Sequence, residues 1–183
     1  MKNQESHFMK VSANANLNAA ARRVSTPFIV DGVPMTFLAY NIDGSTYVGI
    51  RDLALTLSGT SKQFNVTWNG AQNAIHITTC QPYIAVGGEM PSGGADEACA
   101  IRVNSKIFLD GKAVKVNICR IEGRNFFRLR DLCIALDFFV HWEITTPAIA
   151  ISTIKQYQGP IDTGGKGIAP GARNPIMGSL YGK

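Results

Sequence analysis

The residues of this chain best suited to metal binding or covalent chemistry are four cysteines and three histidines. The cysteines lie far apart, without a Cys-x-x-Cys pair or a nearby pair of histidines, and that spacing argues against a zinc site. The histidines are His7, His76 and His141, and no two of them form a His-x-His copper site. No Asn-Tyr-Asp or Asn-Tyr-Glu sequence is present to supply a quinone cofactor. We therefore expect no metal, no cofactor and no enzymatic activity, and the sequence assigns no catalytic residue.

Structural roles explain the cysteines more simply. Cys80 and Cys99 flank a Gly-rich stretch, and they could form a disulfide bond in an oxidising compartment or remain free thiols. Cys133 occupies an apolar position of an expected helix, where we expect it to act as a small buried hydrophobic residue.

Two further features could take part in binding. Arg51-Asp52 and Arg130-Asp131 stand at the start of expected helices, where a carboxylate in the first turn complements the helix dipole. The arginine of each pair could reach a sheet edge or a neighbouring copy. Trp68 and Trp142 could serve as sugar-stacking platforms, but each shares a period-two face with a Phe and a Val, which favours the core. These six residues are the interaction candidates, although structure alone would explain each of them.

The candidates recur because the sequence is internally duplicated. The stretch from Tyr40 to Leu57 returns in altered form from Cys119 to Leu136, in a constant register. After a short polar insertion in the first copy, Phe64-x-Val-x-Trp matches Phe138-x-Val-x-Trp. A match of this length, interrupted once within a polar segment, is typical of a duplicated structural unit.

Each copy predicts the same series of elements. Asp-Gly or Glu-Gly pairs at 31–32, 43–44, 110–111 and 122–123 mark tight hairpins between apolar runs. The period then becomes helical, with apolar residues at i, i+3, i+4 and i+7 from Ile50 to Leu57 and from Leu129 to Leu136. Helices this short need a partner surface, and two alternating strands follow each of them. We expect an α+β fold: two tandem copies of a small, curled antiparallel sheet packed on one short helix, in the order β-β-β-α-β-β.

The first copy contains Ala39-Tyr-Asn-Ile, Arg51-Asp-Leu-Ala, Lys62-Gln-Phe and Asn73-Ala-Ile, followed by Val86-Gly-Gly-Glu-Met. This series resembles the copper amine oxidase N-terminal-like repeat, or stalk domain, which occurs in tandem in secreted proteins of Gram-positive bacteria. The resemblance extends from about Phe28 to Met90, and the second copy departs from it at Ile118-Cys-Arg and Trp142-Glu-Ile. It implies a curled antiparallel sheet around a helix and an extracellular or cell-wall setting. It implies neither copper nor oxidase activity, because the family name comes from an appended, non-catalytic domain.

The chain divides into five segments: an N-terminal arm (1–27), the first stalk-like repeat (28–79), a linker (80–105), the second repeat (106–155) and a flexible Gly/Pro-rich tail (156–183). The arm lacks the apolar core of a signal peptide, and we expect a helical turn at 19–24 at most. No apolar run reaches the ~20 residues that span a membrane.

The net charge of +5 is accompanied by a cluster of basic residues in the second copy: Lys112, Lys115, Arg120, Arg124, Arg128 and Arg130. They could face an anionic cell-wall polymer, although a solvated surface explains them more simply. No nucleic-acid-binding motif accompanies the charge, so we expect no nucleic-acid partner.

These observations favour a non-catalytic extracellular module that acts as a structural spacer, protein-interaction unit or self-assembly unit at a bacterial cell surface. Its partners would be itself or other surface proteins, reached through sheet edges and terminal tails, and a homopolymer is one form of this hypothesis. The alternative is a cell-wall glycan-binding module. Exposure of Trp68, Tyr47 or Phe126 on a shared groove would favour that alternative, and their burial would remove it. An enzyme is the third hypothesis, for which we can assemble no nucleophile or metal constellation.

Overall fold

The computed structural model describes residues 18–158 of the 183-residue chain. Both copies contain the same series of elements, five strands, one helix and two strands. The first copy comprises β1 (Ala19–Arg23), β2 (Phe28–Val30), β3 (Val33–Met35), β4 (Ala39–Ile42), β5 (Ser45–Gly49), α1 (Ile50–Leu57), β6 (Phe64–Asn69) and β7 (Ala74–Thr79). The second comprises β8 (Glu97–Arg102), β9 (Lys106–Leu109), β10 (Lys112–Ala113), β11 (Ile118–Ile121), β12 (Arg124–Arg128), α2 (Leu129–Leu136), β13 (Phe139–Glu143) and β14 (Ala148–Ser152).

Six strands, three from each copy, close into a barrel in the order β1-β4-β5-β12-β11-β8. Neighbouring barrel strands are antiparallel, and the two copies meet where β5 pairs with β12 and where β1 pairs with β8. The rings of Tyr40 and Phe126 meet edge to face inside the barrel, with their centroids 5.1 Å apart. Ala21 and Ala100 belong to the same cluster. Small side chains on β1 and β8 therefore leave room for the large rings.

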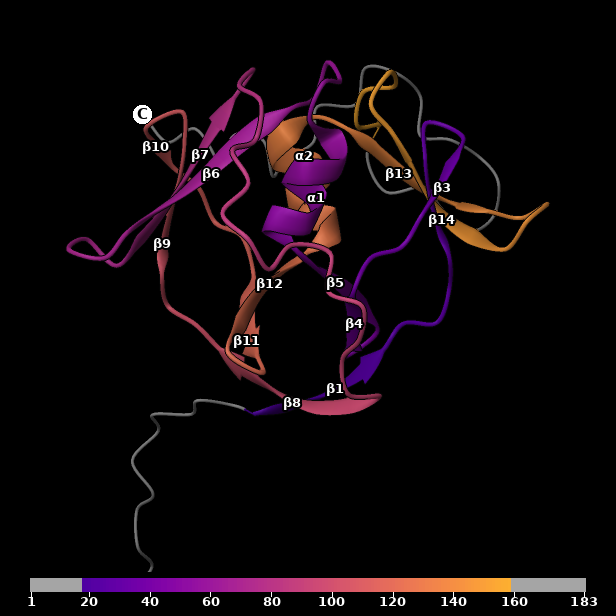
Figure 1. Cartoon of the computed structure of the whole chain (residues 1–183), viewed down its shortest axis with the longest axis horizontal. Coiled ribbons are helices and arrows are strands. Elements are labelled where there is room, and N and C mark those ends of the chain that lie inside the picture. The colour runs from indigo at the N-terminus through magenta and orange to yellow at the C-terminus, as the bar shows by residue number, and fades with distance from the viewer. Residues whose placement is uncertain (1–17, 159–183) are drawn as a thin grey trace, which may run out of the picture.

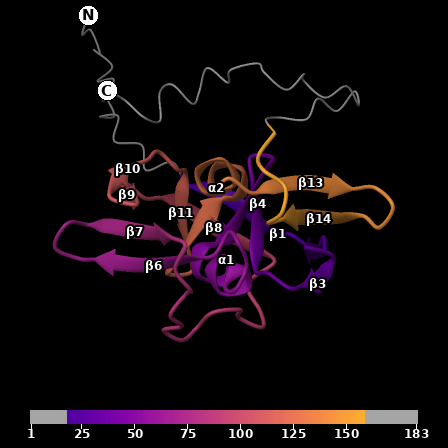
Figure 2. The ribbon, with the colours of Figure 1, turned by 90° about the horizontal axis from the view of Figure 1, so that it is seen from above.

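The remaining strands form two four-stranded sheets, and each sheet combines strands of both copies. One has the order β10-β9-β7-β6 and the other β13-β14-β2-β3. The copies join through parallel pairs, β7 with β9 and β14 with β2. Figure 1 shows the two sheets on either side of the helices, with the barrel below them. In Figure 2, the β6–β7 and β13–β14 hairpins point away from each other.

The helical stripe predicted from the sequence is confirmed. Ile50, Leu53, Ala54 and Leu57 of α1 are buried, and so are Leu129, Leu132, Cys133 and Leu136 of α2. Both stripes belong to one core, together with side chains from the inner faces of both sheets. Because each helix begins directly after a barrel strand, the barrel sets the position of the helices between the sheets.

The predicted tight turns are also confirmed. Asp31-Gly32, Asp43-Gly44, Asp110-Gly111 and Glu122-Gly123 all have positive φ at both residues, the geometry of a type I′ hairpin.

The expected fold of two tandem sheet-on-helix units is wrong. The molecule is mostly β, its barrel belongs to both copies, and its two sheets exchange strands between the copies. Periodicity predicts each element locally, and short turns predict pairing only between consecutive strands. Neither signal predicts that β2 pairs with β14, more than a hundred residues later.

Each copy has five strands before its helix where three were expected, and the strands that lie where none was expected are β1, β4, β8 and β11. Ala19–Arg23 forms β1, although its alanines favour a helical turn in isolation, because pairing with β4 and β8 completes the barrel. β8 lies within the 80–105 segment, which reads as turn-rich. The predicted flexible tail lies outside the described residues from position 159 onward.

Candidate functional site

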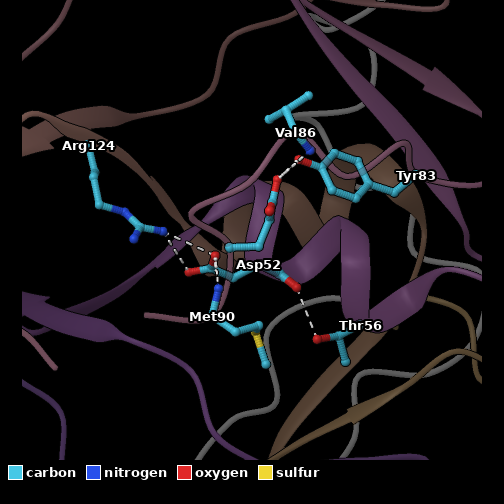
Figure 3. A network of polar contacts seen from close by, with 7 residues as sticks. Asp52, Thr56, Tyr83, Val86, Met90 and Arg124 are labelled. Atoms are coloured by element: carbon cyan, nitrogen blue, oxygen red, sulfur yellow. Dashed lines mark hydrogen bonds and ion pairs between the residues drawn. The ribbon is translucent and has the colours of Figure 1, made fainter. Parts of the chain in front are cut away.

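Arg51 and Asp52 point in opposite directions. Arg51 is exposed, whereas Asp52 is fully buried at the start of α1. The Asp52 carboxylate accepts hydrogen bonds from Nη2 of Arg124 at 3.1 and 3.3 Å and from the backbone N–H of Met90 at 2.9 Å (Figure 3). Burial raises the pKa of Asp52, and the hydrogen bond from Met90 and the charge of Arg124 oppose that rise. This carboxylate ties α1 to β12 of the second copy and to the segment that follows β7.

The segment after β7 is held by its own polar network, also visible in Figure 3. The buried Tyr83 donates its hydroxyl to Oε1 of Glu89 at 2.6 Å, and the N–H of Val86 donates to the same oxygen at 3.0 Å. These bonds lower the pKa of Glu89 to about 2, so it remains charged at neutral pH. Gly87 and Gly88 have φ of +92° and +80°, a conformation that glycine adopts without strain, and they turn the segment back toward α1.

Arg130 and Asp131 repeat this orientation with different partners. Arg130 is exposed and Asp131 is buried. The Asp131 carboxylate accepts from the guanidinium of Arg128 and from both the backbone N–H and the side-chain amide of Asn117, each of the last two at 2.8 Å. Its arginine therefore comes from the same copy, unlike that of Asp52. Both carboxylates are committed to holding the fold.

Beside Asp131 lies a groove between the segment that follows β10 and the outer side of α2, which we call the α2 groove. Its lining includes Lys115, Val116, Asn117, Asp131, Ile134 and Ala135. The groove combines apolar walls with positively charged lysine and arginine side chains.

Trp68 and Trp142 are exposed, and the expectation that they pack in the core is wrong. Their side chains are 48% and 54% exposed. Phe64 and Val66 on the same face of β6 are buried, so the period-two pattern identified the inner face correctly. Trp68 lies near the end of β6, where the strand has passed beyond the core. Trp142 lies at the corresponding place near the end of β13.

The other aromatic candidates for sugar binding are buried. Tyr47 is 8% exposed and Phe126 1% exposed, and both lie in the barrel cluster. They therefore share no open groove with Trp68. Any glycan contact would depend on the two tryptophans.

The cysteines fall into two classes. Cys80 and Cys99 are exposed and free, whereas Cys119 and Cys133 are free and buried. Burial raises the pKa of the Cys133 thiol to about 12, as expected for a cysteine that acts as an apolar core residue.

The strand histidines make ring contacts. His76 stacks on Phe108 with centroids 5.0 Å apart, and His141 stacks on Phe139 at 5.2 Å. Within residues 18–158 no group of three or more His, Cys, Asp or Glu side chains is placed to hold a metal ion. Neither helix in this part of the chain is long and apolar enough to cross a membrane.

Arg124 and Met90 are the residues of the Asp52 site that sequence reasoning missed. Alignment of the two copies contains a signal for one of them. Gly49 stands where the second copy has Arg128, so Asp52 lacks the arginine that pairs with Asp131 and needs another. Nothing local to Arg124 identifies it as that partner.

The described residues thus define a mostly β scaffold in which the two copies interlock. The two aspartates repeated between the copies, Asp52 and Asp131, are buried, and the two tryptophans lie on edge strands of different sheets. The chain matches no protein-family model, no curated protein and no solved structure.

Proposed function

We propose that the chain is a non-catalytic interaction module of a bacterial cell surface, which binds protein, including further copies of itself, through the outer edges of its two sheets. The observation that carries this proposal is the placement of Trp68 and Trp142 on β6 and β13. Each of these strands is an edge strand of its four-stranded sheet, and each tryptophan is about half exposed. Tryptophan is enriched among the residues that dominate binding energy at protein interfaces.

The free edge of β6 offers backbone groups to a partner. Within the described residues β6 pairs only with β7, so its other side presents backbone groups that can pair with an added strand. The N–H of Val66 is already bonded to Oδ1 of Asn65, which also accepts from the N–H of Ile84, so the open part of this edge is the part around Thr67 and Trp68. Proteins commonly protect such an edge with lysine, proline or a bulge, and the sequence of β6 contains no charged residue and no proline. The part of the edge around Trp68 therefore favours strand addition.

Two other observations support the proposal. The carboxylates of Asp52 and Asp131 are buried and hydrogen-bonded within the protein, so they stabilise the fold and are not positioned to contact a substrate. The resemblance of the first copy to stalk repeats of secreted Gram-positive proteins supports the cell-surface setting.

Light scattering on the purified, non-reduced protein, with negative-stain imaging, tests self-assembly. We expect oligomers or filaments whose mass rises with protein concentration. Thr67→Lys, which places a charge on the exposed part of β6, and Trp68→Ala should both shift the population to monomer. Ile154→Ala is the matched control, because it removes an 85% exposed apolar side chain that lies outside any strand. A wild-type protein that remains monomeric at every concentration would contradict self-assembly.

The same exposure of both tryptophans favours a second candidate, a cell-wall glycan-binding module. An exposed indole can stack on the apolar face of a sugar ring. Co-sedimentation with purified peptidoglycan, with and without its anionic polymer, tests this candidate. It requires a wild-type protein that sediments with the glycan and a Trp68→Ala/Trp142→Ala protein that stays in the supernatant, whatever the oligomeric state.

A further inference from the structure

The α2 groove lies where the hydrophobic core beside the helices reaches the surface. Its apolar lining includes Val103, Val114, Val116 and Ala135, and all four are partly buried side chains that pack against that core. The groove has a volume of about 760 Å³, which is the size of a site for a small ligand or a few peptide residues. An apolar side chain that entered the groove would therefore extend the core.

The groove opens between two segments of chain that separate beside α2. The N–H of Val103 donates to the C=O of Ile118 at 3.3 Å, and the N–H of Val114 donates to the C=O of Ile107 at 3.0 Å. Between these two points, no backbone hydrogen bond of the described structure joins residues 104–106 to residues 115–117. A partner can therefore reach the apolar lining without displacing a paired strand.

The lining of the groove is smaller than the equivalent side chains of the first copy. In the register of the duplication, Val116 is the counterpart of Phe37, and Ile107 is the counterpart of Phe28. Phe37 and Phe28 are buried and meet edge to face, with their ring centroids 4.9 Å apart. The second copy thus has aliphatic side chains where the first has two packed rings, and the lost volume leaves room for a group from outside.

The same place has gained positive charge. Lys106 and Lys115 line the groove and are the counterparts of Pro27 and Thr36. Both lysines are exposed, and within residues 18–158 neither forms an ion pair with a carboxylate. The carboxylate in the lining, that of Asp131, already accepts its hydrogen bonds from within the protein. Complementary charge would therefore have to come from a ligand.

We propose that the α2 groove binds an extended acidic segment of a partner protein, in which apolar side chains alternate with carboxylates. An apolar side chain occupies the space left by the small lining residues, and the carboxylates reach Lys106 and Lys115. A purely anionic polymer would match the lysines but would place no apolar group against the valines, so the lining favours a peptide. The groove is separate from the β6 edge, and this contact does not require self-assembly.

Nuclear magnetic resonance of the isotope-labelled, full 183-residue protein tests the proposal. The probe is the peptide acetyl-Glu-Val-Glu-Val-Glu-amide. We expect saturable shifts at the amides of residues 114–116 and 134–135. A peptide with lysine in place of glutamate should bind roughly tenfold more weakly or worse, because it repels the groove lysines. A peptide with glycine in place of valine should lose about as much, because it has no apolar side chain to bury.

Variants of the groove separate its two contributions. Val116→Phe installs the residue that the first copy holds at this position, so it fills the groove with a side chain that the fold accommodates, and it should abolish the saturable shifts. Lys106→Glu/Lys115→Glu should weaken binding roughly tenfold. Arg51→Glu/Arg120→Glu is the control, because it makes the same change of charge at exposed residues outside the groove and should leave the affinity unchanged.

Three results would overturn the proposal. The first is a wild-type protein without saturable shifts at the groove amides, and the second is a folded Val116→Phe protein that binds the peptide as tightly as wild type. The third is inorganic polyphosphate binding at the groove more tightly than the peptide, which would assign it to an anionic polymer. Thr67→Lys should block assembly at the β6 edge and leave peptide binding intact, so failure of one proposal is distinguishable from failure of the other.

Discussion

Thr153 donates both its backbone N–H and its hydroxyl to the carboxylate of Asp31, at 2.8 and 2.6 Å. Thr79 makes the same two bonds to Asp110, at 2.9 and 2.7 Å. Each aspartate opens a hairpin turn of one copy, and each threonine lies at the end of the strand that the other copy contributes. The two clamps therefore fasten the strand exchange at equivalent points on both sheets.

Thr153→Val should lower the free energy of unfolding by about 1–2 kcal/mol, because it removes one hydrogen bond to a charged acceptor at a site where Thr153 is only 4% exposed. Thr79→Val should act in the same direction through Asp110. Urea denaturation followed by circular dichroism measures both. Thr67→Val, which removes an exposed hydroxyl of β6, is the control. An equally large decrease in the free energy of unfolding for Thr67→Val would show that the two threonine–aspartate contacts have no special stabilising role.

Arg124→Met should destabilise the protein by about 3 kcal/mol at neutral pH, because it leaves Asp52 buried without its charged partner. The loss should depend on pH. A carboxyl whose pKa is higher in the folded state binds more protons when folded, so the free energy of unfolding falls as pH rises through that pKa. The pKa of Asp52 is already raised by burial, and removal of Arg124 raises it further.

The difference between Arg124→Met and wild type should therefore be small near pH 4 and grow toward pH 8, as measured by urea unfolding across that range. Asp52→Asn supplies the control background, since it abolishes the titration. If Arg124→Met remained equally destabilising at all pH values, or kept its pH dependence in the Asp52→Asn background, Asp52 would not be the group responsible.

Gly49→Ala should cost about 1–3 kcal/mol, because the added methyl group would lie 2.5 Å from Oδ2 of Asp52 and displace the carboxylate from its partners. Backbone strain does not contribute, since φ at Gly49 is −64°. Gly70→Ala is the matched control, because its methyl group would meet only Nε1 of Trp68, at 3.4 Å. Thermal denaturation of the two variants distinguishes a specific clash at Gly49 from a general cost of replacing glycine.

Thiol titration of the native protein after mild reduction should show Cys80 and Cys99 reacting quickly and Cys119 and Cys133 only after denaturation. Exposure separates the two pairs, and the raised pKa values of the buried thiols slow them further. Rapid reaction of Cys133 would contradict its placement in the core. A non-reduced protein in which Cys80 and Cys99 are both unreactive would reveal a bridge between them.

Features set by neighbours in sequence were predictable. The paired residues at each hairpin turn have the left-handed geometry that Asp-Gly favours, and the apolar spacing of α1 and α2 gave their buried faces. The partners of β2 and β7 were not predictable, because apolar alternation marks a strand without stating which other strand it joins. The duplication made strand partners harder to predict. Because both copies contain equivalent strands, the sequence does not distinguish pairing within one copy from pairing between the two copies.

The candidate site shows a similar division. The position of Asp52 in the first turn of α1 followed from helix periodicity, yet its partners Arg124 and Met90 come from distant segments. The period-two pattern placed Trp68 on the correct face of β6. Its exposure depends on how far the core extends along the strand, and the pattern carries no information about that.

Because the two copies share strands in both sheets and in the barrel, cleavage of the segment between them should not separate them. A single cut between Gly87 and Gly88 would sever the covalent link between the copies, but each half would still contribute strands to both sheets and to the barrel. Separation would require the hydrogen bonds of four strand pairs, β1–β8, β5–β12, β2–β14 and β7–β9, to break together. The nicked protein should remain one particle under native conditions and come apart only in denaturant, so that intact mass on a native column would conceal a broken chain.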